Sequence, residues 1–335
     1  MNIAIIGAGS WGTALAMVLA ANKHQVIMWG REPDIVDNIR IHHKNGVYLP
    51  DVVLPKNITA SSDMEEVLRG CEFVVFATPS HTLREVSAKA RPWLTGKERV
   101  ISVAKGIEMD TFKTGSQVLA EVLKNTVDDD HIGVLSGPSH AEEVSRYMPT
   151  TVVASSHSRQ TALFIQKLFM TPRFRVYHNR DLIGVEVSGA VKNILAIAAG
   201  IGDGAEYGDN AKAALITRGL TEMRRLGIKL GASQDTFSGL TGVGDLIVTC
   251  TSKHSRNRSV GYRIGLGEKL KDIISSMNMV AEGVKTTRSV YHWSRKLEVS
   301  MPITEKVYQV LFEDVSPADA VHQLMTRAPK EEVLF

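Results

Sequence analysis

The stretch that decides the fold is Asn2-Ile3-Ala4-Ile5-Ile6-Gly7-Ala8-Gly9-Ser10-Trp11-Gly12. Residues 3–6 form an apolar run that is too short for a helix, so the run predicts a buried parallel strand ending at the glycines. From Ser10 onward, apolar residues recur at helical spacing, at positions 11, 15, 18 and 19. A second strand is predicted at Gln25–Trp29, which gives the order strand, glycine turn, helix, strand.

The three glycines of this turn each suit a dinucleotide site. We expect Gly7 to permit the turn, Gly9 to let a bulky anion approach the backbone, and Gly12 to let the helix pack closely on the strand. The amides and the positive dipole end of the new helix then favour a pyrophosphate. Glycines alone equally fit a plain turn, but the flanking strands and helix favour dinucleotide binding.

Length and composition indicate a two-domain globular protein. The 335 residues are long for one core, and 44% of them are hydrophobic and 22% charged. With 39 Lys and Arg against 36 Asp and Glu, the net charge of +3 is too small to indicate nucleic acid binding. Two cysteines argue against a disulfide framework, and the histidines lack metal-ligand spacing. We expect no signal peptide, membrane span or metal, and a cytoplasmic location; a homodimer is compatible with these features.

The remaining chain divides into a strand-rich part and a helical part. Short apolar runs predict strands at 73–77, 99–103, 132–135, 151–154 and 174–177, with capping boxes starting helices at Ser62 and Thr114. Beyond residue 179 the pattern predicts helices at 181–199, 210–229, 256–264, 283–296, 304–312 and 317–325. We predict a doubly wound, mainly parallel Rossmann-type sheet domain at 1–180 and an all-helical substrate domain at 181–335, with the chemistry between them.

The end of the second strand bears on the choice of nicotinamide cofactor. Enzymes that bind NAD usually place Asp or Glu there to hold the ribose hydroxyls, whereas this chain has Arg31 followed by Glu32. A guanidinium can pair with a 2′-phosphate and stack on adenine. The alternative is a solvated Arg-Glu pair. We favour NADP(H), with NAD(H) as the second cofactor that the sequence allows.

A nearly all-apolar helix at 187–199 is interrupted by Lys192 and Asn193. An ammonium in such surroundings must be paired or must have a lowered pKa, because an isolated buried charge is costly. A lysine at a cleft can donate a proton to a carbonyl oxygen while hydride reaches the carbon. Ser188 lies one turn earlier on the same face. The alternative is a lysine that extends from the helix edge into solvent.

Two later segments supply an acidic and an anion-binding group. Asp245 follows the glycine-dense turn 239–244, where it could orient a lysine or simply cap the next helix. Ser255-Arg256-Asn257-Arg258 opens a helix, and a helix N-terminus with a guanidinium suits a phosphate monoester. A solvated basic helix start is the alternative for this segment.

Taken together, these motifs resemble the bacterial NAD(P)-dependent glycerol-3-phosphate dehydrogenase family. The shared order covers most of the chain and comprises residues 7–12, Ala104-Lys105-Gly106-Ile107-Glu108, Leu135-Ser136-Gly137-Pro138-Ser139, Val191-Lys192-Asn193, residues 208–214, residues 242–246, residues 255–258 and Ala281-Glu282-Gly283. The resemblance implies reversible reduction of dihydroxyacetone phosphate to sn-glycerol 3-phosphate, which feeds glycerophospholipid synthesis.

The resemblance also implies roles for individual residues. Lys192 would be the proton donor and acceptor, with Lys105 and Asp245 assisting catalysis. The implied cofactor contacts, beside Gly7, Gly9 and Gly12 of the turn, are Ser10, Trp11, Arg31, Tyr48, Lys105, Ala141, Arg256, Val280 and Glu282. The implied substrate contacts are Lys105, Gly137, Ser139, Lys192, Asp245, Ser255, Arg256 and Asn257.

Some positions complicate these roles. Ser139-His140-Ala141-Glu142 also fits a capping box, so Ser139 could be structural. Glu32 stands where relatives often carry a second basic residue, and His140 where they often have Phe.

Two other functions remain open from the sequence. A β-hydroxyacid dehydrogenase would share the sheet domain, the helical domain and the lysine-asparagine helix, but a carboxylate substrate has less need for the cluster at 255–258. A non-catalytic dinucleotide-sensing protein would leave Lys192 unexplained.

Overall fold

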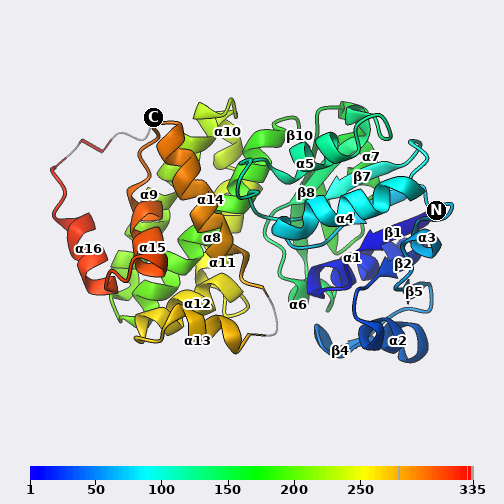
Figure 1. Ribbon diagram of the computed structural model, residues 1–335, viewed down its shortest axis with the longest axis horizontal. Coiled ribbons are helices and arrows are strands. Elements are labelled where there is room, and N and C mark those ends of the chain that lie inside the picture. Colours follow the sequence, from blue (N-terminus) through cyan, green and yellow to red (C-terminus); the bar gives the residue numbers. More distant parts are fainter. Residues whose placement is uncertain (278–279, 330, 333–335) are drawn as a thin grey trace. The chain divides into compact units, whose positions relative to one another are not determined.

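The computed structural model describes residues 1–277, 280–329 and 331–332. The chain forms two compact units (Figure 1). The sheet unit comprises Met1–Lys105 and Lys113–Glu186, and the helical unit comprises Gly106–Phe112 and Val187–Phe335. This division differs from a single cut at residue 180, because residues 106–112 group with the helices and residues 181–186 with the sheet. The assignment of cofactor and substrate binding to separate domains stays a prediction.

The sheet unit contains one eight-stranded sheet in the order β10-β9-β8-β7-β6-β1-β2-β5. Its strands are β1 (Asn2–Ile6), β2 (Gln25–Trp29), β5 (Ile58–Ser61), β6 (Phe73–Phe76), β7 (Arg99–Ser102), β8 (Ile132–Ser136), β9 (Thr150–Ser156) and β10 (Phe174–Asn179). All neighbouring pairs are parallel except β8 and β9. A separate antiparallel pair is formed by β3 (Lys44–Asn45) and β4 (Leu49–Val53).

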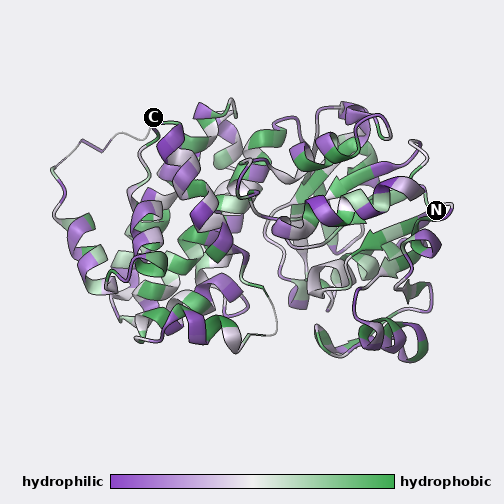
Figure 2. Ribbon diagram, in the orientation of Figure 1, coloured by the Kyte–Doolittle hydropathy of each residue, from purple (hydrophilic) through white to green (hydrophobic). Residues whose placement is uncertain are grey.

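The central strand β1 shows why helices cover both faces. Ile3 and Ile5 pack into one hydrophobic cluster, and Ala4 and Ile6 pack into the other, because successive side chains of a strand point to opposite faces. In Figure 2 the strands of this sheet are coloured mainly as hydrophobic. A strand that is buried on both faces reads as a continuous apolar run. The prediction of a doubly wound, mainly parallel sheet is therefore confirmed.

The helices of the sheet unit lie on these two faces. The first cluster contains residues of α1 (Ser10–Ala21), α2 (Pro33–His42) and α7 (Arg159–Phe169). The second contains residues of α3 (Met64–Leu68), α4 (Leu83–Ala90) and α5 (Gly115–Val122). The short helix α6 (Ala141–Val144) and three 3₁₀ turns, η1 (Ser80–Thr82), η2 (Arg91–Trp93) and η3 (Asp129–His131), complete the unit.

The predicted capping boxes differ in outcome. At α5 the box is confirmed, since the Thr114 hydroxyl and the Gln117 side chain satisfy each other's backbone amides. At α3 the prediction is wrong by one residue, because the cap is Asp63, whose carboxylate accepts from the Glu65 amide at 2.9 Å. Ser62 precedes the cap. Carboxylate and hydroxyl caps are of similar strength, so spacing alone does not choose between neighbouring candidates.

In the part of the helical unit that the structure describes, regular structure is entirely helical. Its helices are α8 (Leu182–Gly204, which begins in the sheet unit), α9 (Gly208–Lys229), α10 (Gln234–Phe237), a π-helical turn η4 (Leu240–Gly244), α11 (Asp245–Thr251), α12 (Arg256–Gly265), α13 (Leu270–Ser275), α14 (Glu282–Lys296), α15 (Pro302–Phe312) and α16 (Pro317–Met325). The predicted cap of α16 is confirmed, because the Ser316 hydroxyl accepts from the Asp319 amide at 3.1 Å. The all-helical prediction is confirmed as well.

Helix α8 is the apolar core of this unit. It is long and apolar enough to cross a membrane by length and composition, yet 83% of its most apolar window is buried inside the protein. Burial of that kind is typical of a core helix rather than a membrane span. Residues 106–112 pack elsewhere in the unit: the Ser289 hydroxyl donates to the Ile107 carbonyl oxygen at 3.1 Å, and the Phe112 ring stacks on Trp293.

Glu222 of α9 is a buried carboxyl that caps α15. It accepts from the amides of Ile303 and Thr304 at 2.6 and 3.1 Å. Burial raises the pKa of Glu222 from 4.5 to about 7, although those hydrogen bonds act in the opposite direction. Between these values the folded state binds more protons than the unfolded chain, so Glu222 lowers the free energy of unfolding as pH rises.

Glu222→Gln should therefore remove this fall in the free energy of unfolding with rising pH. We expect urea unfolding of the wild type to show declining stability from about pH 5 to about pH 7, with the variant gaining relative to it over that range. The Glu305→Gln variant is a matched control, because Glu305 is a carboxyl in the first turn of the same helix, α15. Parallel stability curves for the wild type and Glu222→Gln would contradict the prediction.

Candidate active site

The glycine turn lies between β1 and α1, as predicted. Gly7 has φ +126°, and a Cβ there would stand 2.7 Å from the Ala77 carbonyl oxygen, so the turn requires glycine. A Cβ on Gly12 would stand 2.1 Å from the Gly7 carbonyl oxygen, so the close approach of helix and turn is possible only because residue 12 is glycine. Gly9 differs from both, because no atom lies within 4 Å of where its Cβ would be. The space beside Gly9 and the first turn of α1 fits an anionic cofactor group.

The other predicted cofactor contacts of the sheet unit differ in their burial. Ser10 is buried in the first turn of α1, and Trp11 and Tyr48 are partly buried against the core. Ala141 is buried as the first residue of α6. Arg31 is exposed, and its guanidinium pairs with Glu32 at 2.6 Å.

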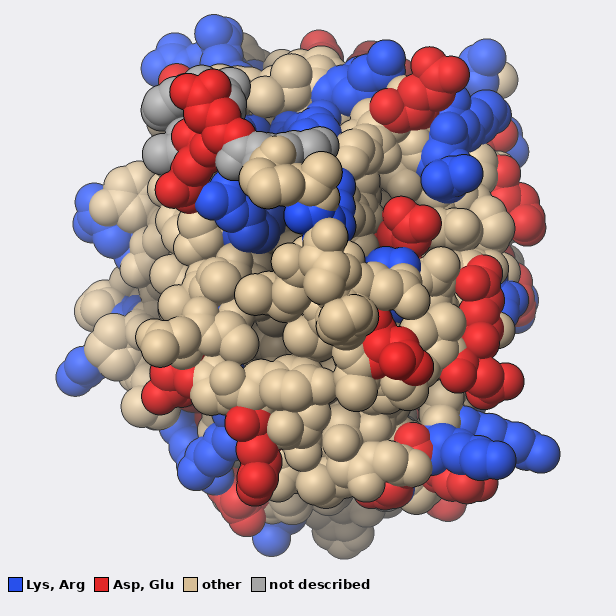
Figure 3. All heavy atoms as spheres, turned by 90° about the vertical axis from the view of Figure 1, so that its left-hand side faces the viewer, with Lys and Arg blue, Asp and Glu red and all other residues tan. Residues whose placement is uncertain are grey.

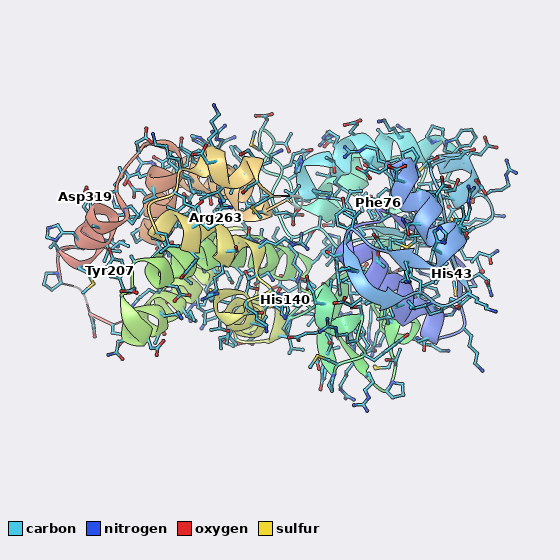
Figure 4. The ribbon with its side chains drawn as sticks, turned by 90° about the horizontal axis from the view of Figure 1, so that it is seen from below. His43, Phe76, His140, Tyr207, Arg263 and Asp319 are labelled. Atoms are coloured by element: carbon cyan, nitrogen blue, oxygen red, sulfur yellow. The ribbon has the colours of Figure 1, made fainter. Side chains whose placement is uncertain are left out.

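A second cluster of predicted residues forms after β7 and β8. Lys105 Nζ donates to the Gly137 carbonyl oxygen at 2.8 Å and lies 3.3 Å from Ser139 Oγ. The Ser139 hydroxyl also donates to that carbonyl at 2.8 Å. The proposed capping box at Ser139 is wrong, because the N-cap of α6 is His140, labelled in Figure 4, and no side chain caps this helix. Lys105, Gly137 and Ser139 thus form one polar group at the sheet's carboxyl edge.

In the helical unit, Lys192 is buried and ion-paired. Its Nζ donates to Asp245 Oδ1 and, at 2.9 Å, to Thr249 Oγ1, and Lys192 and Asp245 are 5% and 0% exposed. The Thr249 hydroxyl donates to the Asp245 carbonyl oxygen at 2.5 Å, one turn back in α11. The lysine that extends from the helix edge is therefore excluded, and pairing is the way in which this ammonium tolerates burial.

Asn193 connects this pair to the start of α12. Its Oδ1 accepts from Asn257 Nδ2 at 2.9 Å, and Asn257 Oδ1 accepts from the Gly283 amide at 2.9 Å. The Ser255 hydroxyl caps α12 by accepting from the Arg258 amide at 3.2 Å. The side chains of Ser255 and Asn257 therefore hold the fold of the site. Any substrate contacts predicted for these residues must share those groups or use backbone amides.

The remaining predicted residues of the helical unit lie near the same helix ends. Arg256 is partly buried in the first turn of α12. Glu282 opens α14, and Val280 precedes it with 42% of its surface exposed. Ser188 is buried, and its hydroxyl oxygen has no hydrogen bond within the described residues 1–277, 280–329 and 331–332.

A cavity of about 680 Å³ lies elsewhere in the helical unit, lined by parts of α8, α9, α15, α16 and the chain after it. None of the predicted site residues is among the described residues that line it. Figure 3 shows the face that carries α16, where uncharged residues fill much of the centre. The cavity is therefore not the predicted active site.

Family models match both parts of the chain. The description "NAD-dependent glycerol-3-phosphate dehydrogenase N-terminus" matches residues 2–162, and the corresponding C-terminus matches residues 181–322. The chain belongs to the NAD-dependent glycerol-3-phosphate dehydrogenase family. The resemblance inferred from the motifs is confirmed, and neither a β-hydroxyacid dehydrogenase nor a dinucleotide-sensing protein is favoured.

Individual relatives agree with the family assignment. A glycerol-3-phosphate dehydrogenase [NAD(P)+] of Bacillus pumilus is 52% identical over 99% of this chain and 96% of its own. Glycerol-3-phosphate dehydrogenase from Coxiella burnetii has a solved structure with a TM-score of 0.93 at 41% identity, covering 97% of this chain and 99% of that one. The yeast glycerol-3-phosphate dehydrogenase structure has a TM-score of 0.82 at 26% identity, covering 97% and 99%.

The sequence analysis did not predict the contact of Thr249 with Lys192, nor the partner of Asn193. Thr249 follows Asp245 by one helical turn, and that i, i+4 spacing within α11 could have identified it. Asn193 follows Lys192 directly in an apolar helix, where a second buried polar residue required a partner.

Proposed function

We propose that this chain catalyses the reversible reduction of dihydroxyacetone phosphate to sn-glycerol 3-phosphate with NAD(P)H. The observation that carries the proposal is the buried Lys192–Asp245 pair within a chain of this family. The product would feed glycerophospholipid synthesis in the cytoplasm.

The overall reaction is tested by following NADPH absorbance with dihydroxyacetone phosphate as substrate. Dihydroxyacetone without the phosphate serves as the control. Equal rates with both ketones would contradict the proposed phosphate site.

We propose that a single atom, Lys192 Nζ, transfers the proton of the reaction. The cofactor supplies the hydride when bound. Lys192 Nζ gives a proton to the carbonyl oxygen of the substrate and takes it back in the reverse direction. Asp245 and Thr249, both on α11, hold that nitrogen in place. Lys105 and Ser139 lie at the carboxyl edge of the sheet, where we propose that Lys105 contacts both cofactor and substrate and that Ser139 contacts the substrate.

The start of α12 is the proposed phosphate site. The positive dipole end of this helix and the guanidinium of Arg256 suit a dianion. Arg256→Ala should raise the substrate KM by about tenfold to a hundredfold, because a charged hydrogen bond contributes about 1.5 to 3 kcal/mol. Steady-state kinetics at saturating NADPH measures the effect.

Arg263 provides the matched control for that variant. It lies on the same helix but pairs with Glu268 at 2.5 Å near the other end. Arg263→Ala should leave the substrate KM unchanged. An unchanged KM in Arg256→Ala would place the phosphate elsewhere.

The cofactors are NADP(H), which we favour, and NAD(H). Glu32 accepts from Arg31 Nε and from its Nη2, so the pair competes with a 2′-phosphate for the guanidinium. Glu32→Gln should increase the preference for NADPH over NADH, and Arg31→Asp should reverse it, each by about tenfold. The ratio of kcat/KM values for the two cofactors measures this preference.

Arg40→Ala is the control for these variants, because Arg40 pairs with Asp37 on the exposed face of α2. If Arg31→Asp leaves the ratio unchanged, the solvated-pair alternative is correct.

We also propose a homodimer in solution. The exposed Met325 and the uncharged centre of the α16 face in Figure 3 are compatible with a covered surface. Light scattering at micromolar concentration distinguishes a dimer from a monomer.

A further inference from the structure

Asn45 contacts the glycine turn although it lies outside every motif that identified the site. It belongs to β3 and follows the end of α2 near His43, which is labelled in Figure 4. Only 1% of its surface is exposed. Its Nδ2 donates to the Ala8 carbonyl oxygen and to Thr13 Oγ1, both at 2.8 Å.

Thr13 continues this arrangement on α1. Its hydroxyl donates to the Gly9 carbonyl oxygen at 2.9 Å, and its amide donates to the same oxygen at 2.9 Å. Thr13 is completely buried. Asn45 and Thr13 therefore hold two consecutive carbonyl groups of the turn, those of Ala8 and Gly9.

Holding those carbonyls fixes the direction of the amides that follow them. In a planar trans peptide the N–H points opposite to the C=O. The Gly9 amide therefore points away from buried Asn45, and the Ser10 amide points away from Thr13. Amides at the start of a helix have no acceptor within the helix, and the dipole makes that end favourable for anions. The open space at Gly9 lies beside the same turn.

We propose that Asn45 is a positioning residue for the dinucleotide, acting through Thr13 and the Ala8–Gly9 peptide to orient backbone amides toward its pyrophosphate. This inference rests on the cofactor site proposed at the glycine turn. A residue that only filled this space would be apolar, because a buried amide is costly unless paired. Asn45 Oδ1 has no hydrogen bond in the described part of the chain, so the amide group is retained for its two donated bonds.

Asn57, which contacts the other end of α1, offers a matched control. Asn57 Nδ2 donates to the carbonyl oxygens of Ala20 and His24, at 3.0 and 2.7 Å, around the C-terminal end of α1. Asn57 thus makes the same kind of double contact away from the glycine turn. A purely structural role for Asn45 predicts similar behaviour of the two asparagines.

The test compares Asn45→Leu, Thr13→Val and Asn57→Leu in the full chain. NADPH fluorescence gives Kd, steady-state kinetics at saturating NADPH gives kcat and the KM of dihydroxyacetone phosphate, and thermal unfolding gives Tm. We expect Asn45→Leu and Thr13→Val to raise the NADPH Kd at least tenfold, with kcat and the substrate KM within twofold of wild type. Asn57→Leu should lower Tm and leave Kd unchanged. Thr13→Val is nearly isosteric, so it tests the inference even if Asn45→Leu does not fold.

Gly9→Ala separates failure of this inference from failure of the cofactor site. If Gly9→Ala weakens NADPH binding while Asn45→Leu and Thr13→Val bind like wild type, Asn45 has no positioning role. An equal rise in Kd for the Asn45 and Asn57 variants would also overturn the inference. If Gly9→Ala itself binds NADPH like wild type, the cofactor site is not at this turn.

Discussion

Replacing Lys192 by methionine should reduce kcat by at least about a hundredfold while NADPH still binds. A positioned general acid contributes about 10² to 10⁴ to the rate, and methionine has no proton to give. Lys192 is 5% exposed and its ammonium is held by Asp245 and Thr249, so solvent cannot readily replace it. Single-turnover absorbance with dihydroxyacetone phosphate and fluorescence titration with NADPH measure the two quantities separately.

The variant needs a control for stability, because it leaves Asp245 without its partner. Removing one member of a buried ion pair costs about 3 to 5 kcal/mol. Lys192→Met/Asp245→Asn removes both charges and should recover much of the unfolding free energy without recovering turnover. Activity that returned together with stability would show that Lys192 is structural. Wild-type kcat in the single variant would remove Lys192 from the mechanism.

The strands and helices that were predicted correctly have strong local patterns. β1 and β6 are short apolar runs because both faces of the sheet are covered, and α8 is apolar nearly all round because it forms a core. The missed strand β5 reads Ile58-Thr59-Ala60-Ser61, where small and polar residues conceal a strand at the sheet edge. β9 and β10 run antiparallel to the other strands of the sheet, and that direction has no signature in a buried pattern.

The site shows a similar limit. The sequence identified Lys192 and Asp245 separately, because each is a charge in an unusual setting, and the structure shows their pairing across 53 positions of sequence. The links made by Asn193, Thr249 and Asn45 were not predicted. A buried amide or hydroxyl is common in proteins, and its role depends on which backbone groups the fold brings to it.

Alanine substitutions at Gly9 and Gly12 should affect different properties, the NADPH Kd and the Tm respectively, because the two glycines have different surroundings. At Gly9 the backbone angle φ of −76° suits any residue, and the new Cβ would contact no protein atom. We expect Gly9→Ala to keep the wild-type Tm and to raise the NADPH Kd at least tenfold, because the methyl group occupies the space proposed for the pyrophosphate.

At Gly12 the new Cβ would stand 2.1 Å from the Gly7 carbonyl oxygen and 3.2 Å from Ala77 Cβ. Backbone must move to relieve that contact, and overpacking of this kind costs about 1 to 3 kcal/mol. Gly12→Ala should therefore lower Tm by several degrees. Thermal unfolding without cofactor and NADPH titration at a temperature where both variants are folded separate the two effects. If Gly9→Ala lost stability, or if it bound NADPH like wild type, the space beside Gly9 would not be the pyrophosphate site.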